Sequence, residues 1–570
     1  MAEEVWMLQT KKADFKQIGA RFRIDPVTAR IIRNRGIEGE AAIDRYLNGT
    51  LDDLYDPMLL KDMERAVSIL CEAVDTGKKI RIVGDYDIDG VCSTYILLQA
   101  FERLGSDVDF EIPDRIKDGY GINESIIEQA HADGVEVILT CDNGISAFHQ
   151  VELAKKYGMT VVITDHHEVP LDGEKEKIPP ADAVIDPKQA DCPYPFPEIC
   201  GAVVAYKLVQ VLYARRGVPQ MEWLDLLEFA AIATVGDVMK LQDENRILVK
   251  YGLKKMAQTK NLGLRRLAEK NNLDLEAITA YHIGFVIGPC LNAGGRLKTA
   301  KEALALLRAQ SEEEAERLAE ELKELNDTRK DMTEQGTEAA KLQVESWYQK
   351  DKVLVVFLPE CHESLAGIIA GRLREYYQKP AIVLTRGEEA VKGSGRSIDE
   401  YHMFKKLTEV SDLLLKFGGH PLAAGLSLEE KNIDEFRRRL NENAGLTEED
   451  FKAKVWIDVP MPVGYVTERL VRELSCLEPF GQGNEKPLFA EKSLRIRASR
   501  VLGRNRNVVK MTLEETDGHA IEALYFGDGT AFEEERAGRR EIDVVYYPDI
   551  NEYNGRKTLQ AVIRRYKFRG

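Results

Sequence analysis

Short apolar runs alternate with helix-forming stretches between residues 78 and 187. The runs are rich in β-branched residues and end near residues 83, 139, 163 and 185. The helical stretches between them are Val91–Leu104, Glu124–Ala132 and Ser146–Tyr157. This alternation predicts a parallel sheet covered by helices, in which a site forms beyond the carboxyl ends of the strands.

The pattern on either side of this region is mostly helical. Residues 1–60 are mixed and helical, and we expect them to pack on the sheet domain. Residues 200–300 are helical too, with expected breaks at Gly288-Pro289 and Gly294-Gly295. A capping box at Ser311 and Glu314 then starts a polar helix that runs to about Trp347, long enough at roughly 50 Å to bridge two domains.

The second half of the chain predicts two further domains. Strand-like runs at 353–357 and 381–384 enclose a helix at 364–377, which indicates a second α/β unit with loops at 393–397 and 417–420. From about residue 453 only short strands follow, which is typical of a small β-barrel. An OB-fold that binds single strands fits five or so strands, and an SH3-like barrel with a structural role is the alternative. The predicted class is therefore α/β multidomain: a parallel-sheet domain, a long connecting helix, a second α/β domain and a C-terminal OB-like β-barrel.

Composition supports a large intracellular protein. The chain has 570 residues, of which 44% are hydrophobic and 31% are charged, enough for several globular domains. No apolar stretch is long enough for a bilayer, and the N-terminus shows no secretory signal. Eight scattered cysteines without a C-x-x-C pair argue against structural zinc and disulfides. We expect a cytoplasmic protein without a membrane partner.

The net charge of −17 is unusual for a protein that binds nucleic acid, but the charge is unevenly distributed. From residue 491 onward, Lys and Arg outnumber Asp and Glu by 16 to 13. The last seven residues, 564–570, are basic with interleaved aromatic residues. A locally positive surface can hold phosphates on an acidic protein, although a solvated tail explains the charge equally well.

Acidic and imidazole side chains follow three of the predicted strands. They lie in the segments Gly84-Asp85-Tyr86-Asp87-Ile88-Asp89-Gly90, Asp142-Asn143-Gly144 and Asp165-His166-His167. Because parallel strands end at one edge, we expect these groups to converge there. Carboxylate oxygens with one or two imidazoles suit Mg²⁺ or Mn²⁺, and the histidine favours Mn²⁺.

The first of these segments carries two carboxylates with the same orientation if it is extended. Asp87 and Asp89 would then face one ion cluster, and Gly84 and Gly90 would allow sharp turns on either side. The segment also resembles the start of a calcium loop. However, it follows a strand, and the twelfth loop position holds an apolar residue instead of Glu, so calcium is set aside.

Each further ligand candidate has a structural alternative. Asp142 could be a turn residue, and His166 could be a core imidazole. Asp237 lies in an apolar helical stretch, where a carboxylate is costly unless it is paired or bound to metal. Several oxygen ligands and a histidine suffice for two ions that activate water for in-line displacement at phosphorus. The residues thus predict metal-dependent hydrolysis of a phosphoester or phosphoanhydride.

The order of these motifs resembles the DHH phosphoesterase superfamily, and within it the RecJ family of single-stranded-DNA exonucleases. Nearly the whole chain carries the resemblance, which includes the three segments above. The further motifs are Asn34-Arg35-Gly36, Gly119-Tyr120-Gly121, Thr234–Asp237, Gly288-Pro289, Asn292-Ala293, Gly295-Arg296, Ser394–Ser397, Gly418–His420 and Pro479-Phe480-Gly481.

The resemblance implies a role for each matching residue. Asp87 and Asp142 would hold one Mn²⁺ or Mg²⁺, and Asp89, Asp142, His166 and Asp237 would hold a second. Asp85 and His167 would be catalytic, with His167 contacting the scissile phosphate or orienting His166. The implied substrate-binding residues are Arg115, Asn292, Arg296, Ser394, Arg396, Gly418, Gly419 and His420; among them Arg296, Ser394 and Arg396 would receive the 5′ end of the strand.

The resemblance also implies domains and a function. The expected domains are an N-terminal segment at 1–60, a DHH domain at 61–305, the connecting helix at 306–350, a DHHA1 domain at 351–450 and an OB-fold at 451–570. The implied activity is 5′–3′ hydrolysis of single-stranded DNA to mononucleotides in repair and recombination, with single-strand-binding protein and a RecQ-like helicase as partners. An oligoribonuclease or cyclic-dinucleotide phosphodiesterase is the alternative enzyme. A non-catalytic replication scaffold is disfavoured, because all five metal-ligand positions are filled.

Overall fold

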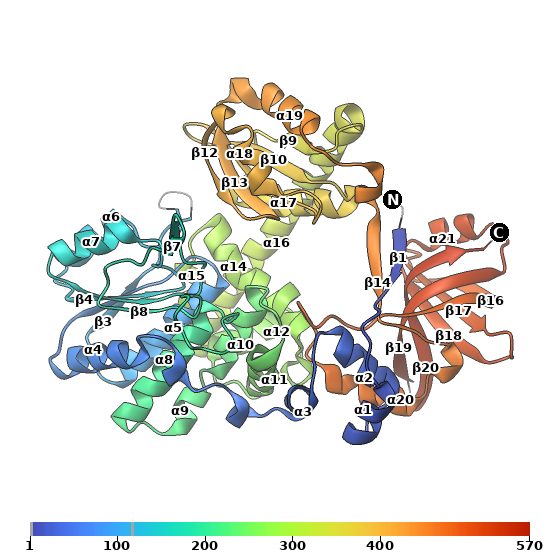
Figure 1. The fold of residues 1–570 in the computed structure, drawn as a ribbon, viewed down its shortest axis with the longest axis horizontal. Helices are drawn as coiled ribbons and strands as arrows, with labels where there is room; N and C mark the ends of the chain where they lie inside the picture. Colours follow the sequence, from blue (N-terminus) through green and yellow to red (C-terminus); the bar gives the residue numbers. More distant parts are fainter. Residues whose placement is uncertain (1–3, 116–118, 554, 570) are drawn as a thin grey trace. The chain divides into compact units, whose positions relative to one another are not determined.

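The computed structural model describes residues 4–115, 119–553 and 555–569, and it divides into two compact units (Figure 1). The first unit holds Leu54–Met239 and Ile247–Ala453. The second unit holds Glu4–Asp53, Lys240–Arg246 and residues 454–569. No helix in these described ranges is long and apolar enough to cross a membrane. The eight cysteines are free thiols.

A five-stranded parallel sheet forms the centre of the first unit, as predicted. Its strand order is β3-β2-β4-β5-β8, with β3 at Val108–Glu111, β2 at Ile80–Val83, β4 at Val137–Cys141, β5 at Thr160–Thr164 and β8 at Ala183–Ile185. The helices on its two faces are α4 (Met63–Asp75), α5 (Ile88–Arg103) and α8 (Gly201–Arg216) on one side and α6 (Glu124–Ala132) and α7 (Phe148–Lys156) on the other (Figure 1). The edge strand β3 was missed, because its four alternating residues are only half-buried.

A helical region follows the sheet. Its helices are α9 (Gln220–Leu224), α10 (Leu227–Gly236), α11 (Asp243–Met256), α12 (Leu262–Lys270), α13 (Ala280–His282), the π-helix η4 (Ile283–Ile287), α14 (Gly288–Leu297) and α15 (Lys301–Arg308). The expected breaks at Gly288-Pro289 and Gly294-Gly295 are both wrong, because α13, η4 and α14 form one continuous rod that ends at Leu297. Pro289 therefore lies inside the rod, close behind the π-helix η4, and it cannot supply an N–H to the helical ladder there.

The long polar helix is confirmed. Helix α16 spans Glu312–Gln343 and continues into the π-helix η5 at Val344–Tyr348. Its first turn is capped by the Ser311 hydroxyl, which accepts a hydrogen bond from the Glu314 N–H at 3.2 Å.

The second sheet of this unit has the order β12-β13-β11-β10-β9. Its strands are β12 (Leu414–Gly419), β13 (Ala423–Leu428), β11 (Val391–Arg396), β10 (Ala381–Arg386) and β9 (Leu354–Phe357), and its helices are α17 (Glu363–Tyr377), α18 (Met403–Thr408) and α19 (Ile433–Glu442). The two glycine-rich segments expected as loops lie mostly on β11 and β12. Gly393 shows why this expectation was wrong. A Cβ at this position would lie 2.5 Å from the Leu384 side chain, so the close packing of the sheet requires glycine here. In the sequence, glycine instead indicated a loop.

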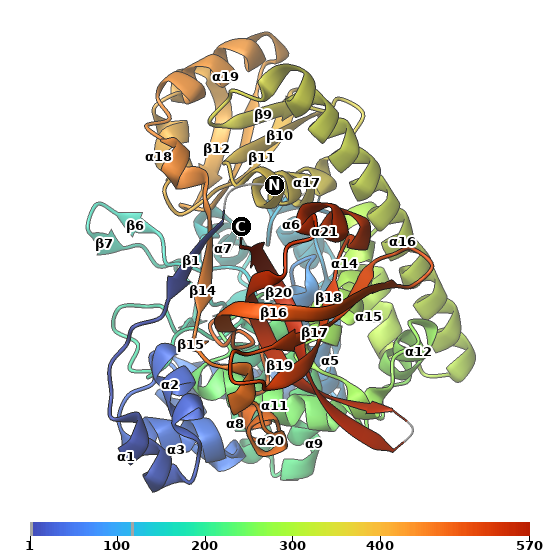
Figure 2. The ribbon, with the colours of Figure 1, turned by 90° about the vertical axis from the view of Figure 1, so that its right-hand side faces the viewer.

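The second unit contains a closed five-stranded barrel (Figure 2). Strands β16 (Phe489–Leu502), β17 (Val508–Glu514), β18 (Ala520–Phe526), β20 (Arg556–Phe568) and β19 (Glu541–Tyr553) pair in that order, and β19 also pairs with β16. The pair β18–β20 is parallel, whereas the other pairs in the ring are antiparallel. This closed order is that of an OB-fold, which confirms the predicted barrel. Two helices accompany the barrel: α20 (Glu468–Leu474) and α21 (Gly529–Arg536).

The N-terminal segment belongs to the barrel unit. Strand β1 (Glu4–Leu8) pairs with β14 (Ala453–Ile457), and α1 (Phe15–Phe22), α2 (Pro26–Asn34) and α3 (Glu40–Asn48) follow. Ile31, Ile32, Ile43 and Tyr46 share one apolar core with barrel residues. The expected packing on the sheet domain therefore does not describe this segment, since an amphipathic pattern specifies a buried face and not its partner.

Candidate metal centre

The loop after β2 delivers three carboxylates to the edge of the sheet. Asp85 follows the strand and is buried. Asp87 is the N-cap of α5, and its carboxylate accepts hydrogen bonds from the N–H groups of Asp89 at 2.9 Å and Gly90 at 3.1 Å. Asp89 lies in the first helical turn, so the expected extended segment is wrong. The carboxylates of Asp87 and Asp89 are presented by a helix start.

The two glycines around these acids permit close packing instead of the sharp turns expected from the sequence. A Cβ on Gly90 would lie 2.4 Å from the Asp85 carbonyl oxygen. A Cβ on Gly84 would lie 2.1 Å from the Thr94 hydroxyl. Both distances are too short for any side chain, so the loop can fold back over α5 only with glycine at these positions.

The amino end of α8 holds Asp89 in place. Its two carboxylate oxygens accept hydrogen bonds from the N–H groups of Gly201 and Ala202, both at 2.7 Å. Free N–H groups and the helix dipole favour an ionised carboxylate at this position. Gly201 also admits Asp142, because a Cβ at 201 would lie 2.7 Å from the Asp142 Cβ.

Asp142 and His166 form the middle of the cluster. Asp142 follows β4 with a φ of 61°, and His166 follows β5. The Nε2 atom of His166 lies 3.1 Å from Asp142 Oδ1, 3.4 Å from Asp89 Oδ2 and 3.8 Å from Asp237 Oδ2. Asp237 itself comes from the C-cap of α10. Acids from three separate segments thus meet around one imidazole, which comes from a fourth segment.

The ligand atoms divide into three overlapping groups, each within 4.8 Å. The groups are Asp85, Asp87 and Asp142; Asp89, His166 and Asp237; and Asp142, His166 and His167. Asp142 is shared between two groups, as is His166. The predicted metal residues Asp87, Asp89, Asp142, His166 and Asp237 are therefore brought together, with Asp85 and His167 beside them.

Burial and mutual repulsion make these acids difficult to ionise on their own. Burial, followed by the charge of Asp89, raises the pKa of Asp142 well above its usual range. The same two causes, with Asp87 added, raise the pKa of Asp237 to about 8. In the described part of the chain no Lys or Arg forms an ion pair with any of the five predicted ligands. A set of hard oxygen donors with one neutral imidazole and no Lys or Arg partner among the residues described fits divalent Mg²⁺ or Mn²⁺.

His167 has a different environment from His166. Its Nδ1 lies 2.8 Å from Asp165 Oδ1, and Asp165 also accepts backbone N–H bonds from Ile145 and His166. Burial alone would lower the pKa of His167, but the hydrogen bond and charge of Asp165 raise it to about 9. His167 is therefore a cation at neutral pH. In contrast, burial lowers the pKa of His166, which leaves its imidazole neutral and able to bind metal.

The Tyr120 hydroxyl lies between Asp142 and His167, and the sequence did not indicate this position. It donates to the Asp142 carbonyl at 2.7 Å and lies 3.0 Å from Nδ1 of His167. The motif Gly119-Tyr120-Gly121 was part of the resemblance, but nothing in it assigned a role to the ring.

Three of the predicted arginines form a second cluster in the same unit. Arg296 donates to the Ser364 carbonyl at 3.0 Å, and Arg396 donates to the Ser394 hydroxyl at 3.3 Å. Arg115 lies over the Tyr86 ring at 4.8 Å. None of the three has a carboxylate partner within the residues described. Burial and the charges of Arg115 and Arg329 lower the pKa of Arg296 to about 10, so these cations lie close together and unbalanced.

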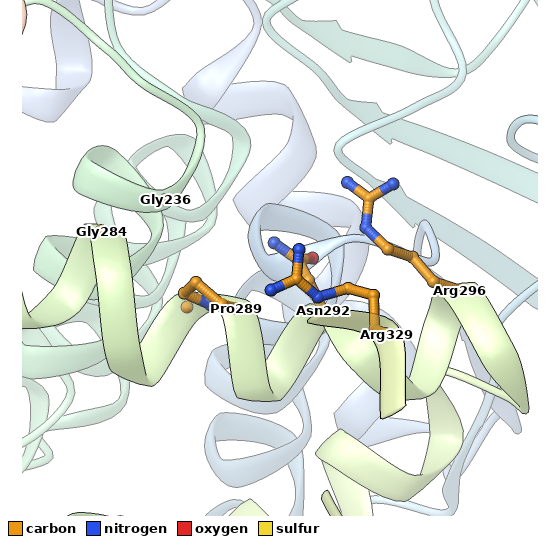
Figure 3. A pocket seen from close by; sticks show the side chains of 7 residues that line it. Gly236, Gly284, Pro289, Asn292, Arg296 and Arg329 are labelled. Atoms are coloured by element: carbon orange, nitrogen blue, oxygen red, sulfur yellow. The ribbon is translucent and has the colours of Figure 1, made fainter. Parts of the chain in front are cut away.

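A pocket beside the metal cluster brings Asn292 and Arg296 together with Arg329 (Figure 3). Gly236, next to Asp237, lines the same pocket. Arg329 comes from α16, and its Nε donates to Asn326 at 3.1 Å. Arg329 was not predicted from the sequence, because a charged residue on a polar helix is expected to face solvent.

The remaining predicted substrate residues lie apart from these clusters. Gly418 and Gly419 end β12, and the His420 N–H donates to the Ala423 carbonyl at 2.7 Å. The His420 side chain is exposed and lowers the pKa of Glu168, after the larger effects of Lys188 and burial. No contact links these three residues to the ligand groups in the described structure.

Family comparisons agree with this architecture. Residues 79–234 match the DHH family N-terminal domain, residues 350–445 match the DHHA1 domain, and residues 457–565 match the RecJ OB domain. A carboxylate–histidine cluster on a DHH sheet, with a DHHA1 domain after it, defines a DHH-type phosphoesterase.

Comparison with individual relatives shows which family within this class the chain belongs to. The single-stranded-DNA-specific exonuclease RecJ of Bacillus subtilis (strain 168) is 36% identical over 98% of this chain and 70% of its own length. The protein of the same name from Escherichia coli (strain K12) is 34% identical over 95% of both chains. The crystal structure of RecJ in complex with Mn²⁺ from Thermus thermophilus superposes with a TM-score of 0.84 at 28% identity, covering 99% of this chain and 79% of that one. The chain belongs to the RecJ family.

Proposed function

We propose that this protein is a metal-dependent exonuclease that degrades single-stranded DNA from the 5′ end to mononucleotides. The observation that carries the proposal is the pairing of two clusters in one unit: among the described residues, the metal-cluster acids have no Lys or Arg partner, and the arginines have no carboxylate partner. The first suits divalent metal, and the second suits phosphate. Membership of the RecJ family and the OB barrel support single-stranded DNA, a polymer, as the substrate.

Asp85, Asp87 and Asp142 would hold one Mn²⁺ or Mg²⁺ ion, and Asp89, Asp142, His166 and Asp237 would hold the other. Two such ions supply an activated water and stabilise the attacking and leaving oxygens of in-line displacement. The chain's own residues orient this chemistry. The α8 amino end fixes Asp89, and Asp165 holds His167 as a cation beside the site, where it can donate a hydrogen bond to a phosphate oxygen.

The arginine cluster would receive the terminal 5′ phosphate. Arg115, Arg296 and Arg396 offer guanidinium groups that bind phosphate bidentately, and Ser394 adds a hydroxyl. Asn292 lies in the pocket between this cluster and the metal residues. The backbone of Gly418 and Gly419 and the side chain of His420 would contact the strand further along. The OB barrel would bind single strands through its basic and aromatic surface.

The role we propose is in DNA repair and recombination. Single-strand-binding protein and a RecQ-like helicase are the partners proposed for this role, because a single-strand nuclease needs an unwound and protected substrate. Co-purification of each partner with the full chain, with and without DNA, tests these two interactions.

Nucleotide release from end-labelled strands tests the activity. With Mn²⁺, we expect a 5′ label on single-stranded DNA to appear as mononucleotide at early times, while a 3′ label stays on long fragments. Release from the 3′ end first would contradict the direction. Preference for dinucleotides over long strands would instead indicate the phosphodiesterase alternative, and preference for RNA would indicate an oligoribonuclease.

A further inference from the structure

Two large aromatic side chains stand exposed on the rod that lines the pocket. Tyr281 is 63% exposed and Phe285 is 67% exposed. Their rings stack on each other, with centroids 4.7 Å apart and planes inclined by 26°. Ile283 and Ile287 on the same stretch are fully buried, so the π-helix η4 is anchored by one face and presents the rings on another. An uncovered pair of this size marks an interaction site.

The ring pair continues the face of the rod that forms the pocket. Gly284, Gly288, Asn292 and Arg296 line the pocket and recur every four residues along the continuous rod α13–η4–α14. Phe285 precedes the pocket residue Pro289 by the same interval. Phe285 lies between the pocket residues Gly284 and Pro289 in the sequence, and it is about two helical turns, roughly 10 Å along the rod, from Asn292. In Figure 3 the pocket residues follow this rod from Gly284 to Arg296.

The chemistry of the pocket indicates which kind of ligand would stack on the ring pair. Arg296 and Arg329 bring two guanidinium groups into the pocket, and neither has a carboxylate partner in the residues described. A ligand that fills both places must carry an anion and, about two helical turns or roughly 10 Å along the rod, a flat apolar group. A phosphate with its attached base has this chemistry, and every base has a face that can stack on an aromatic ring.

We propose that Tyr281 and Phe285 form a base-stacking platform for a nucleotide whose phosphate lies in the Asn292–Arg296–Arg329 pocket. The inference rests on the proposed function and adds a contact that the metal residues and the 5′-phosphate cluster do not supply. The start of the rod that carries the rings is capped, because Nδ1 of His282 accepts a hydrogen bond from the Thr279 N–H at 3.1 Å. A platform fixed in this way binds bases without selecting among them.

Binding to strands with and without bases tests the platform. The full-length protein is titrated, without divalent metal, with a 5′-phosphorylated oligothymidylate and with the same oligomer carrying abasic sites. We expect the double variant Tyr281→Ala/Phe285→Ala to bind the base-bearing strand about tenfold more weakly than the wild type. The abasic strand should bind both proteins about equally, because it has nothing to stack.

Matched variants distinguish stacking from folding. Trp347→Ala removes another aromatic side chain that is 70% exposed, and it should leave both affinities unchanged. Tyr281→Phe/Phe285→Tyr keeps both rings and should retain wild-type binding. Equal losses on both strands, or no loss at all, would overturn the platform while the proposed function stands. Failure of the wild type to bind either strand would overturn both.

Discussion

The buried Arg35–Asp458 pair of the barrel unit is balanced in charge, whereas the metal cluster of the sheet unit is not. In the barrel unit, Arg35 forms a two-pronged ion pair with Asp458 at 2.7 and 3.2 Å, and both side chains are almost fully buried. The Arg246 guanidinium donates to the carbonyls of Tyr46, Cys476 and Glu478. In the sheet unit, the acids around His166 have no Lys or Arg partner among the described residues, and the nearby His167 is paired with Asp165.

This contrast separates structural charges from charges that await a ligand. A buried ion pair with all its hydrogen bonds made is costly to break, because one partner is left uncompensated. A crowded set of acids without a cation instead raises the free energy of the folded chain until a cation binds. The same logic applies with opposite sign to Arg296 and Arg396, which a phosphate would neutralise.

The largest effect is expected for Asp142→Asn on catalysis. Asp142 belongs to two of the ligand groups, so its loss should reduce strand hydrolysis about a thousandfold, equivalent to about 4 kcal/mol of transition-state stabilisation. The metal-free variant should unfold at the same denaturant concentration as the wild type or a higher one, because a repelling charge is removed. Activity near the wild-type level would exclude Asp142 from the metal centre.

Asp458→Ala should reduce stability, whereas Asp142→Asn should reduce catalysis. Removal of this carboxylate leaves Arg35 buried and unpaired, which should lower the free energy of unfolding of the barrel unit by about 3–5 kcal/mol. Chemical denaturation followed by intrinsic fluorescence measures this loss. Glu468→Ala is the control, because its ion pair with Arg472 is at the surface of the same unit and should matter little. A loss no greater than that of the control would show that the buried pair is not structural.

Metal should reverse the pH dependence of the sheet unit. The pKa values of Asp142 and Asp237 are raised, so without metal these groups stabilise the fold while protonated and lose that contribution as the pH rises from about 4 towards the folded pKa, which is about 8 for Asp237. Mn²⁺ needs the ionised groups, so its binding should tighten from pH 6 to pH 9. At a hundredfold excess over Kd it should add about 2.7 kcal/mol. Thermal unfolding at several pH values, with Mn²⁺ or with chelator, measures both trends; an equal metal effect at all pH values would contradict this assignment.

Glu228 offers the smallest test, because it is a lone buried acid in the sheet unit. Burial raises its pKa to about 7, although the Thr259 hydroxyl donates to it at 2.7 Å. The folded pKa is above the unfolded one, so stability should be highest below about pH 4.5 and fall as the pH rises through 7. Glu228→Gln should flatten this part of the pH–stability curve and leave the metal response intact. An unchanged slope would mean that Glu228 is solvated.

Much of the sheet unit could be predicted because its signals are local. Four of the five parallel strands are apolar runs, and each acid of the metal cluster follows a strand or ends an apolar helix. Parallel strands necessarily bring their ends to one edge, so the meeting of Asp87, Asp142 and His166 followed from order alone. The local conformation of Asp87 and Asp89 could not be predicted in this way, because the same residues are compatible with a helix start and with an extended loop.

The sequence by itself determined the class of fold, the acids and histidines of the site, and the family. These depend on periodicity and on residue chemistry, which are written locally. Only the tertiary structure decided that residues 4–53 pack with the barrel, that the glycines of β11 lie in a sheet, and that Arg329 enters the pocket from α16. Each of these is a choice of partner between distant segments. It is made by shape and burial after the chain collapses, and no local pattern specifies it.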